Sequence, residues 1–102
     1  IPDGIGHRLR VMVYRRIWGI SIGKGVIIAG RIRFASPQHV ARNVRIGDRA
    51  VFNRNVFIDA AAPVTIGAGA SIAHDVLIIT TDHKIGTPEF RSADRIEKPV
   101  VI

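Results

Sequence analysis

The sequence predicts an all-β fold: a parallel β-solenoid in one domain, preceded by a short helix. Three observations favour it. Large apolar residues recur every six positions, the apolar residues are mostly aliphatic, and helical spacing is confined to the N-terminal end. The chain has 102 residues, enough for one domain. With 47% hydrophobic but 6% aromatic residues, its core must be built from Ile, Val and Ala.

The six-residue period is the strongest of these observations. After one two-residue insertion it continues to the edge of a polar segment. The ten large residues are Ile22, Ile28, Phe34, Val40, Ile46, Phe52, Ile58, Ile66, Ile72 and Ile78. We expect each to point inward from a short strand, with the next residue at a bend that requires positive φ. Three such walls form a coil of roughly 18 residues, and coils stack as a solenoid.

A sandwich of short strands with regular turns is the alternative to a solenoid. A sandwich needs alternation with period two rather than a fixed period of six. Because all ten periodic positions carry a large apolar residue, the solenoid is favoured.

Segments 22–26, 46–50 and 66–70 read Ile-Gly-Lys-Gly-Val, Ile-Gly-Asp-Arg-Ala and Ile-Gly-Ala-Gly-Ala. They resemble the hexapeptide repeats of left-handed β-helix acyltransferases. This resemblance implies left-handed winding, a homotrimer and sites between neighbouring subunits. The spacing itself does not indicate handedness, and most parallel crossovers are right-handed.

Residues 1–19 are expected to form a basic capping helix, in which Leu9, Met12, Val13 and Ile17 fall at helical spacing. Covering the open end of the first coil is the expected role, because a solenoid needs its terminal core covered. Contact with an anionic membrane is the alternative for a basic amphipathic helix. Residues 20–79 then form the coils, 80–98 a catalytic loop and 99–102 the start of a further coil.

The period fails after Ile79, where Thr80-Thr81-Asp82-His83 begins a polar segment. This segment, together with the return Lys98-Pro99-Val100-Val101-Ile102, resembles the catalytic loop of galactoside, maltose and colanic-acid acetyltransferases. The resemblance covers residues 20–102. In that family further coils follow the return and supply much of the coenzyme A contact. We therefore expect coils C-terminal to Ile102 to be needed for activity.

The family resemblance implies an acetyl-CoA-dependent O-acetyltransferase in which His83 is the catalytic base. The acceptor is expected to be a hydroxyl of a saccharide, of the surface-polysaccharide type. An imidazole suits this role because it exchanges protons near neutral pH, and the chain has no cysteine for a covalent intermediate. An exposed loop histidine is the alternative for His83. Asp82 is a candidate substrate-binding residue, and it either orients the imidazole or shapes the turn.

Three further residues are candidates for binding the acceptor. Asn53 and Asn55 resemble an Asn-x-Asn stretch that contacts acceptor sugars in galactoside-type enzymes. Asp59 is expected on the same wall as the strand that leads to His83. Asn53 and Asp59 also occupy expected bend positions, so a purely conformational role remains open for both.

Composition bears on the remaining partners. His7, His39 and His74 are too scattered for a zinc site, so no metal is expected. The net charge of +7 suits a polyanion, but the signatures of the common nucleic-acid modules are absent. Without a signal peptide or an apolar span, the expected location is cytoplasmic. A non-catalytic β-helix module that serves assembly or binding is the competing function, and a nucleic-acid binder a third that rests on charge alone.

Overall fold

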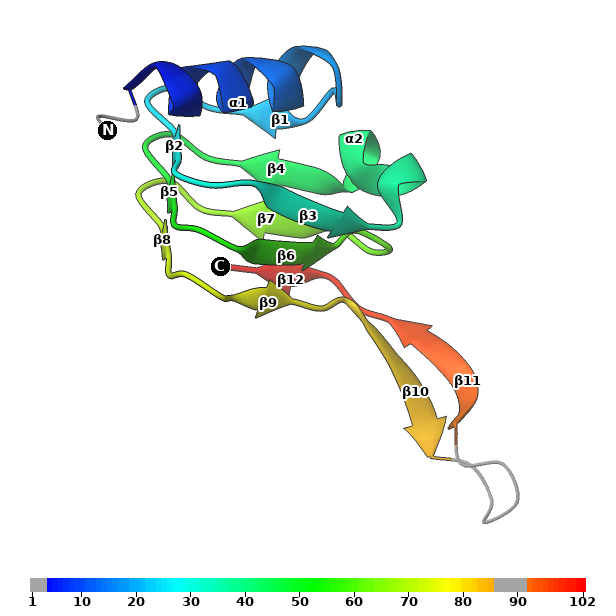
Figure 1. Ribbon diagram of the computed structural model, residues 1–102. Coiled ribbons are helices and arrows are strands. Elements are labelled where there is room, and N and C mark those ends of the chain that lie inside the picture. The colour runs from blue at the N-terminus through cyan, green and yellow to red at the C-terminus, as the bar shows by residue number, and fades with distance from the viewer. Residues whose placement is uncertain (1–3, 86–91) are drawn as a thin grey trace.

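The computed structural model describes residues 4–85 and 92–102, which form mainly short strands in parallel sheets behind one N-terminal helix (Figure 1). Sheet A contains β1 (Ser21–Ile22), β4 (Val44–Ile46), β7 (Val64–Ile66) and β12 (Val100–Val101). Sheet B contains β2 (Ile27–Ile28), β5 (Val51–Phe52) and β8 (Ser71–Ile72). Sheet C contains β3 (Ile32–Ala35), β6 (Val56–Asp59) and β9 (Leu77–Ile78).

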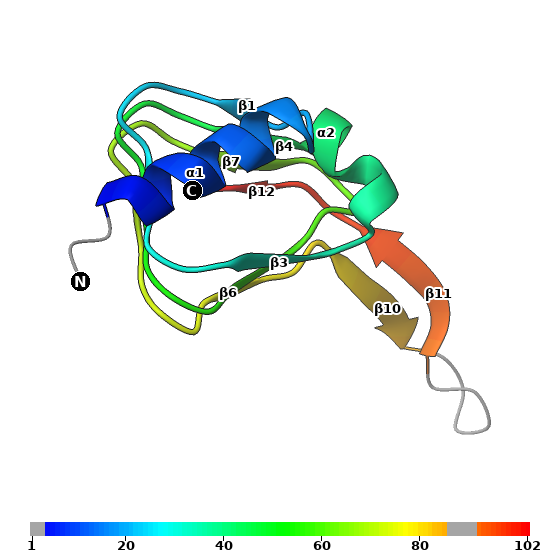
Figure 2. The ribbon, with the colours of Figure 1, turned by 45° about the horizontal axis from the view of Figure 1, so that its top comes forward.

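The chain visits sheets A, B and C in the same order in each turn, an arrangement compatible with a parallel β-helix. Figure 2 shows successive turns of the chain following one another around the same path. The predicted fold of parallel strands behind a short helix is therefore confirmed at this level. In the described part of the chain, no helix combines the length and apolarity needed to cross a bilayer.

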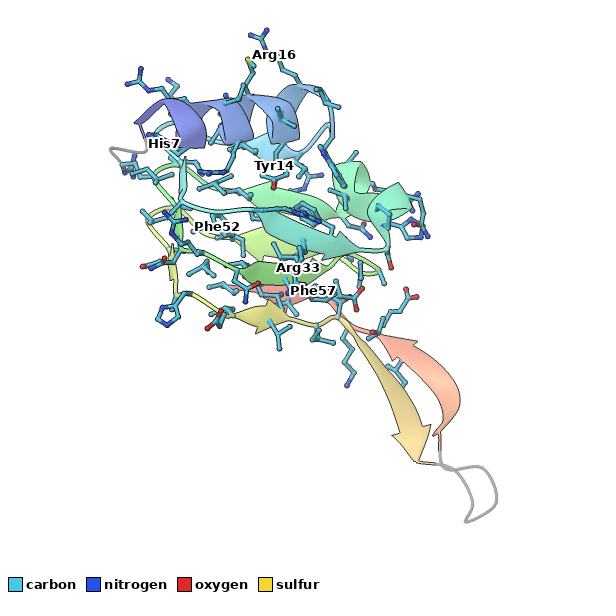
Figure 3. The ribbon with its side chains drawn as sticks, in the orientation of Figure 1. His7, Tyr14, Arg16, Arg33, Phe52 and Phe57 are labelled. Carbon is cyan, nitrogen blue, oxygen red and sulfur yellow. The ribbon has the colours of Figure 1, made fainter. Side chains whose placement is uncertain are left out.

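The periodic apolar residues stack on one another in the interior. Ile28, Phe52 and Ile72 are partners across sheet B, and Phe52, labelled in Figure 3, is completely buried. Ile58 lies directly on Ile78 in sheet C. Burying one such side chain contributes about 1.5–3 kcal/mol. The stacked interior therefore dominates the stability of the fold.

The first coil is longer than predicted, and Val40 is not on a strand. Ile22 pairs with Ile46, 24 positions later. The extra length is a helical insertion made of η1 (Pro37–His39) and α2 (Val40–Asn43). Val40 lies on α2 and is fully buried. Because the insertion is as long as one repeat, the apolar period continues through it in the sequence.

The bends also differ from the prediction. Positive φ falls three positions after the large residue, at Gly25, Arg49 and Gly69 and again at Asn55 and Asp75. After β1, β4 and β7 the residue directly after the large one is a glycine, because the neighbouring coil packs closely against it. A Cβ on Gly47, for example, would lie 2.6 Å from the backbone nitrogen of Ala68.

The predicted buried face of the N-terminal helix was wrong. In α1 (Gly4–Arg16), the side chains buried on the first coil are Val11 and Tyr14. Leu9 and Met12 are 54% and 45% exposed, and Ile17, just after the helix, is 78% exposed. The helix still covers the first coil (Figure 1), but through the opposite face. The Tyr14 hydroxyl explains why this face of the helix is buried, because it forms hydrogen bonds with the backbone of Ile32 in β3.

Candidate catalytic hairpin

The segment that breaks the period forms an antiparallel hairpin that projects from the corner of the coils (Figures 1 and 2). It consists of β10 (Thr81–Ile85) and β11 (Ser92–Glu97), and it leaves after β9 and returns as β12. The backbone of His83 pairs with Arg95, and that of Asp82 with Ile96. The side chains of Asp82 and His83 lie outside the described part of the structure, as do residues 86–91.

Asp59 and Thr80 fasten the base of the hairpin to the coils. Thr80 is 3% exposed, and its hydroxyl donates to the carbonyl oxygen of Asp59 at 3.1 Å. The same hydroxyl accepts from the Ala62 N–H at 3.1 Å. The second foot of the hairpin is held in the same place, because the Lys98 N–H donates to the Thr80 carbonyl at 2.8 Å. Both ends of the hairpin therefore start from fixed positions.

The carboxylate of Asp59 is the centre of this arrangement. Its Oδ2 accepts from the Thr81 hydroxyl at 2.7 Å and from the Thr80 N–H at 3.3 Å, and its Oδ1 accepts from the Ala61 N–H at 3.1 Å. Burial acts to raise the pKa of Asp59, but the hydrogen bonds from Thr81, Ala61 and Thr80 together hold the pKa below its ordinary value of 3.8. Asp59, at the end of β6, is thus an ionised anchor for Thr81, which lies two positions before His83 on β10.

The corner beneath the hairpin is closed by small residues and one buried amide. Ala60, Ala61 and Ala62 are all buried at the turn from sheet C to sheet A. The Asn43 amide donates to the carbonyl oxygens of Ala60 and Ala61 at 2.8 and 3.3 Å, which ties α2 to this corner. The inserted helix therefore stiffens the platform from which the hairpin leaves.

The two candidate asparagines lie elsewhere. Asn55 directly precedes β6 and Asp59 ends it, which separates the two by about 13 Å of extended chain. Asn55 has positive φ, accepts from Arg33 Nη2 at 3.2 Å, and donates to Asp75 Oδ1 at 2.7 Å. Asn53 is exposed, and its side chain accepts from the next N–H of the backbone at 2.8 Å. Neither Asn53 nor Asp59 has the positive φ that the bend prediction gave them.

The other histidines do not join the hairpin. His7 lies on α1, His74 is exposed on the turn before β9, and the Nδ1 atom of His39 lies 2.6 Å from an Arg42 guanidinium nitrogen. Over residues 4–85 and 92–102, no three His, Asp or Glu side chains gather in a way that would hold a metal ion.

No family model, curated protein or solved structure matches the chain. The geometry of the hairpin and its anchor is therefore the main evidence for a functional site. Thr80 and Thr81 as partners of Asp59, and Asn43 as the corner amide, were not predicted as site residues. The signal for the threonines was their place at the point where the aliphatic period ends.

Proposed function

We propose that this chain is an O-acetyltransferase that moves an acetyl group from acetyl-CoA to a saccharide hydroxyl, with His83 as the general base. The observation that supports the proposal is the anchored hairpin. The hairpin that begins with Thr-Thr-Asp-His projects from an otherwise regular solenoid, and hydrogen bonds of Asp59 and Thr80 hold both of its ends at the coils. A purely structural coil has no need of such a projection, and loops on rigid scaffolds commonly carry function.

The chemistry requires a proton acceptor beside the reacting hydroxyl. In this proposal the imidazole of His83 accepts the proton as the hydroxyl oxygen bonds to the thioester carbonyl carbon. The carbon–sulfur bond then breaks, and the departing thiolate of coenzyme A takes the proton back from the imidazolium. Asp59 does not touch the reacting atoms here. It is a positioning residue that fixes the start of β10 and therefore the position of the His83 backbone.

The proposal includes the finer features that the hexapeptide resemblance implies. We infer a left-handed winding of the coils, a homotrimer with sites between subunits, and a cytoplasmic location where acetyl-CoA is at hand. Asp82, Asn53 and Asn55 remain candidates for acceptor contact. The separation of Asn55 from the hairpin base favours Asp82 among them within one subunit.

The test measures coenzyme A release from acetyl-CoA over a panel of saccharide acceptors. The chain itself, a form carrying further hexapeptide coils after Ile102, and His83→Ala in each are compared. His74→Ala is the matched control, because His74 is an exposed histidine outside the hairpin. We expect turnover in the longer form, a loss of about 10²–10⁴-fold in His83→Ala, and wild-type rates in His74→Ala. Absence of both turnover and acetyl-CoA binding in a folded longer form would favour the non-catalytic module.

A further inference from the structure

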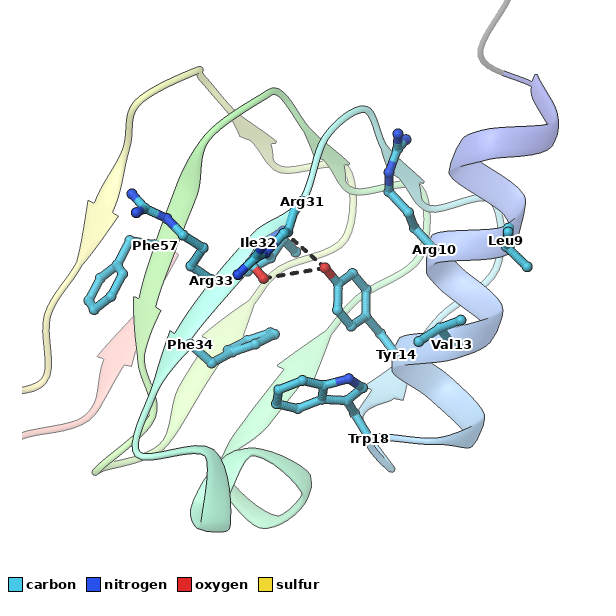
Figure 4. A pocket seen from close by; sticks show the side chains of 10 residues that line it. All are labelled: Leu9, Arg10, Val13, Tyr14, Trp18, Arg31, Ile32, Arg33, Phe34 and Phe57. Atoms are coloured by element: carbon cyan, nitrogen blue, oxygen red, sulfur yellow. Dashed lines mark hydrogen bonds between the residues drawn. The ribbon is translucent and has the colours of Figure 1, made fainter.

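A hollow of about 670 Å³ lies between α1 and β3, the edge strand of sheet C, and side chains from both faces of β3 line it (Figure 4). Tyr14, Trp18 and Phe34 form its aromatic wall, with ring centroids 5.3–6.2 Å apart, and Phe57 adds a fourth ring. Its volume falls within the range of ligand pockets. None of its lining residues belongs to the hairpin segment 80–98, so it is separate from the proposed catalytic site.

The aromatic wall is held in a fixed position. The Tyr14 hydroxyl accepts from the Ile32 N–H at 3.0 Å and donates to the Ile32 carbonyl at 3.3 Å, as the dashed lines in Figure 4 show. Both bonds are buried, so the helix and β3 are locked together at this point. A ring bound against Trp18 and Phe34 would therefore meet a preformed surface rather than one that must order itself.

Arginines line the polar side of the same hollow. Arg31 and Arg33 flank the buried Ile32, and because side chains alternate along an extended chain they lie on one face. Both are exposed. The Arg33 guanidinium is oriented by the Asn55 side chain at 3.2 Å, which is itself fixed by Asp75 at 2.7 Å.

A second hollow of about 300 Å³ adjoins the first and shares Arg31 and Arg33 with it. Its lining adds Arg54, which packs over Gly30, where a Cβ would meet the arginine at 3.0–3.2 Å. The residues that line the two hollows include four arginines and neither Asp nor Glu. The pair of hollows thus offers planar cationic donors beside an aromatic surface.

We infer that these two hollows bind an acidic saccharide, whose sugar ring rests on Trp18 and Phe34 and whose carboxylate or phosphate binds Arg31, Arg33 and Arg54. Guanidinium groups bind such anions bidentately, and the apolar face of a ring suits an aromatic wall. This inference rests on the proposed function for the choice of a saccharide. It goes beyond that function because it assigns a recognition site outside the hairpin and an anionic class of acceptor.

Trp18 provides the test, because it is the only tryptophan in the chain and it lines the first hollow. Its fluorescence is titrated with trigalacturonate, with a neutral trigalactoside and with adenosine 3′,5′-bisphosphate. We expect a saturable change with trigalacturonate that weakens in added salt, and at least tenfold weaker binding of the neutral sugar. Arg33→Gln and Arg54→Gln should each weaken trigalacturonate binding about tenfold.

Arg45→Gln is the matched control, because Arg45 is an exposed arginine on β4 of sheet A. It should bind trigalacturonate as the wild type does, and circular dichroism verifies the fold of each variant. Equal response to the two sugars, or loss of binding in Arg45→Gln as large as in Arg33→Gln, would overturn the inference. A response to the bisphosphate alone would assign the hollows to a nucleotide instead. The assay contains no acetyl-CoA, so its failure leaves the His83 test of acetyl transfer unaffected.

Discussion

At the scale of single residues, Asp59 shows how a buried charge is kept ionised. Its carboxylate loses solvent in the corner of the coil but gains donors from two N–H groups and a hydroxyl. Asp59 was recognised in the sequence as a candidate by its place on the wall. The hydrogen-bond partners of Asp59 could not be predicted in the same way. Thr80 is 21 positions further along the chain, and only the length of the coil shows that the two residues are neighbours.

The Asp59→Asn substitution should make the folded state less stable at neutral pH by about 1–3 kcal/mol, because an amide cannot accept all of these bonds. A lowered pKa in the folded state means that the ionised group stabilises the fold above its ordinary pKa of 3.8, and that this contribution is lost as pH falls through the folded-state value. Urea unfolding of the wild type from pH 6 down to about pH 2 should therefore show a steeper loss of stability than Asp59→Asn. Asp48→Asn removes an exposed carboxylate and controls for net charge. Equal slopes for the wild type and Asp59→Asn would contradict the anchor role.

At the scale of the elements, the strands were predictable because the apolar period directly reports which residues face inward. Two features of the fold could not be predicted from this period. The helical insertion η1–α2 kept the period in phase, and its buried Val40 imitated a strand residue. The N-terminal helix has apolar residues on both faces, so spacing alone could not select the one that Tyr14 fixes to β3.

The turns between sheets A and B give an element-level prediction. Gly47 is needed for close packing, whereas Gly69 has a φ of +71° and open space where a Cβ would lie. Gly47→Ala should cost about 1–3 kcal/mol because the new Cβ meets the backbone of the next coil. Gly69→Asn should cost less than about 1 kcal/mol, since asparagine tolerates positive φ and nothing obstructs it. Urea unfolding of both variants decides the matter, and the opposite order of costs would show that conformation, not packing, governs these turns.

At the scale of the whole molecule, an exposed apolar strip on the outer face of sheet C lies next to the hollow between α1 and β3. Arg33, Phe57 and Leu77 are neighbours in register across β3, β6 and β9. Arg33 and Phe57 line the hollow, while Leu77 and nearby Ile79 are 66% and 49% exposed. Exposed apolar residues grouped in this way mark contact surfaces, and the predicted homotrimer is the occupant that the hexapeptide resemblance implies.

If sheet C is the contact between subunits, Leu77→Lys should lower the average molecular mass in sedimentation velocity, because each copy of the interface would then bury an ammonium group. Val101→Lys is the matched control: Val101 is 78% exposed, but it lies on β12 in sheet A. We expect Val101→Lys to sediment as the wild type does. The reverse result would place the contact between subunits on sheet A, away from the hollow that Arg33 and Phe57 line.

With the contact on sheet C, a neighbouring copy would lie one strand away from Phe57, at the edge of the hollow. In that case Leu77→Lys should also alter the Trp18 titration with trigalacturonate, although Leu77 does not line the hollow itself.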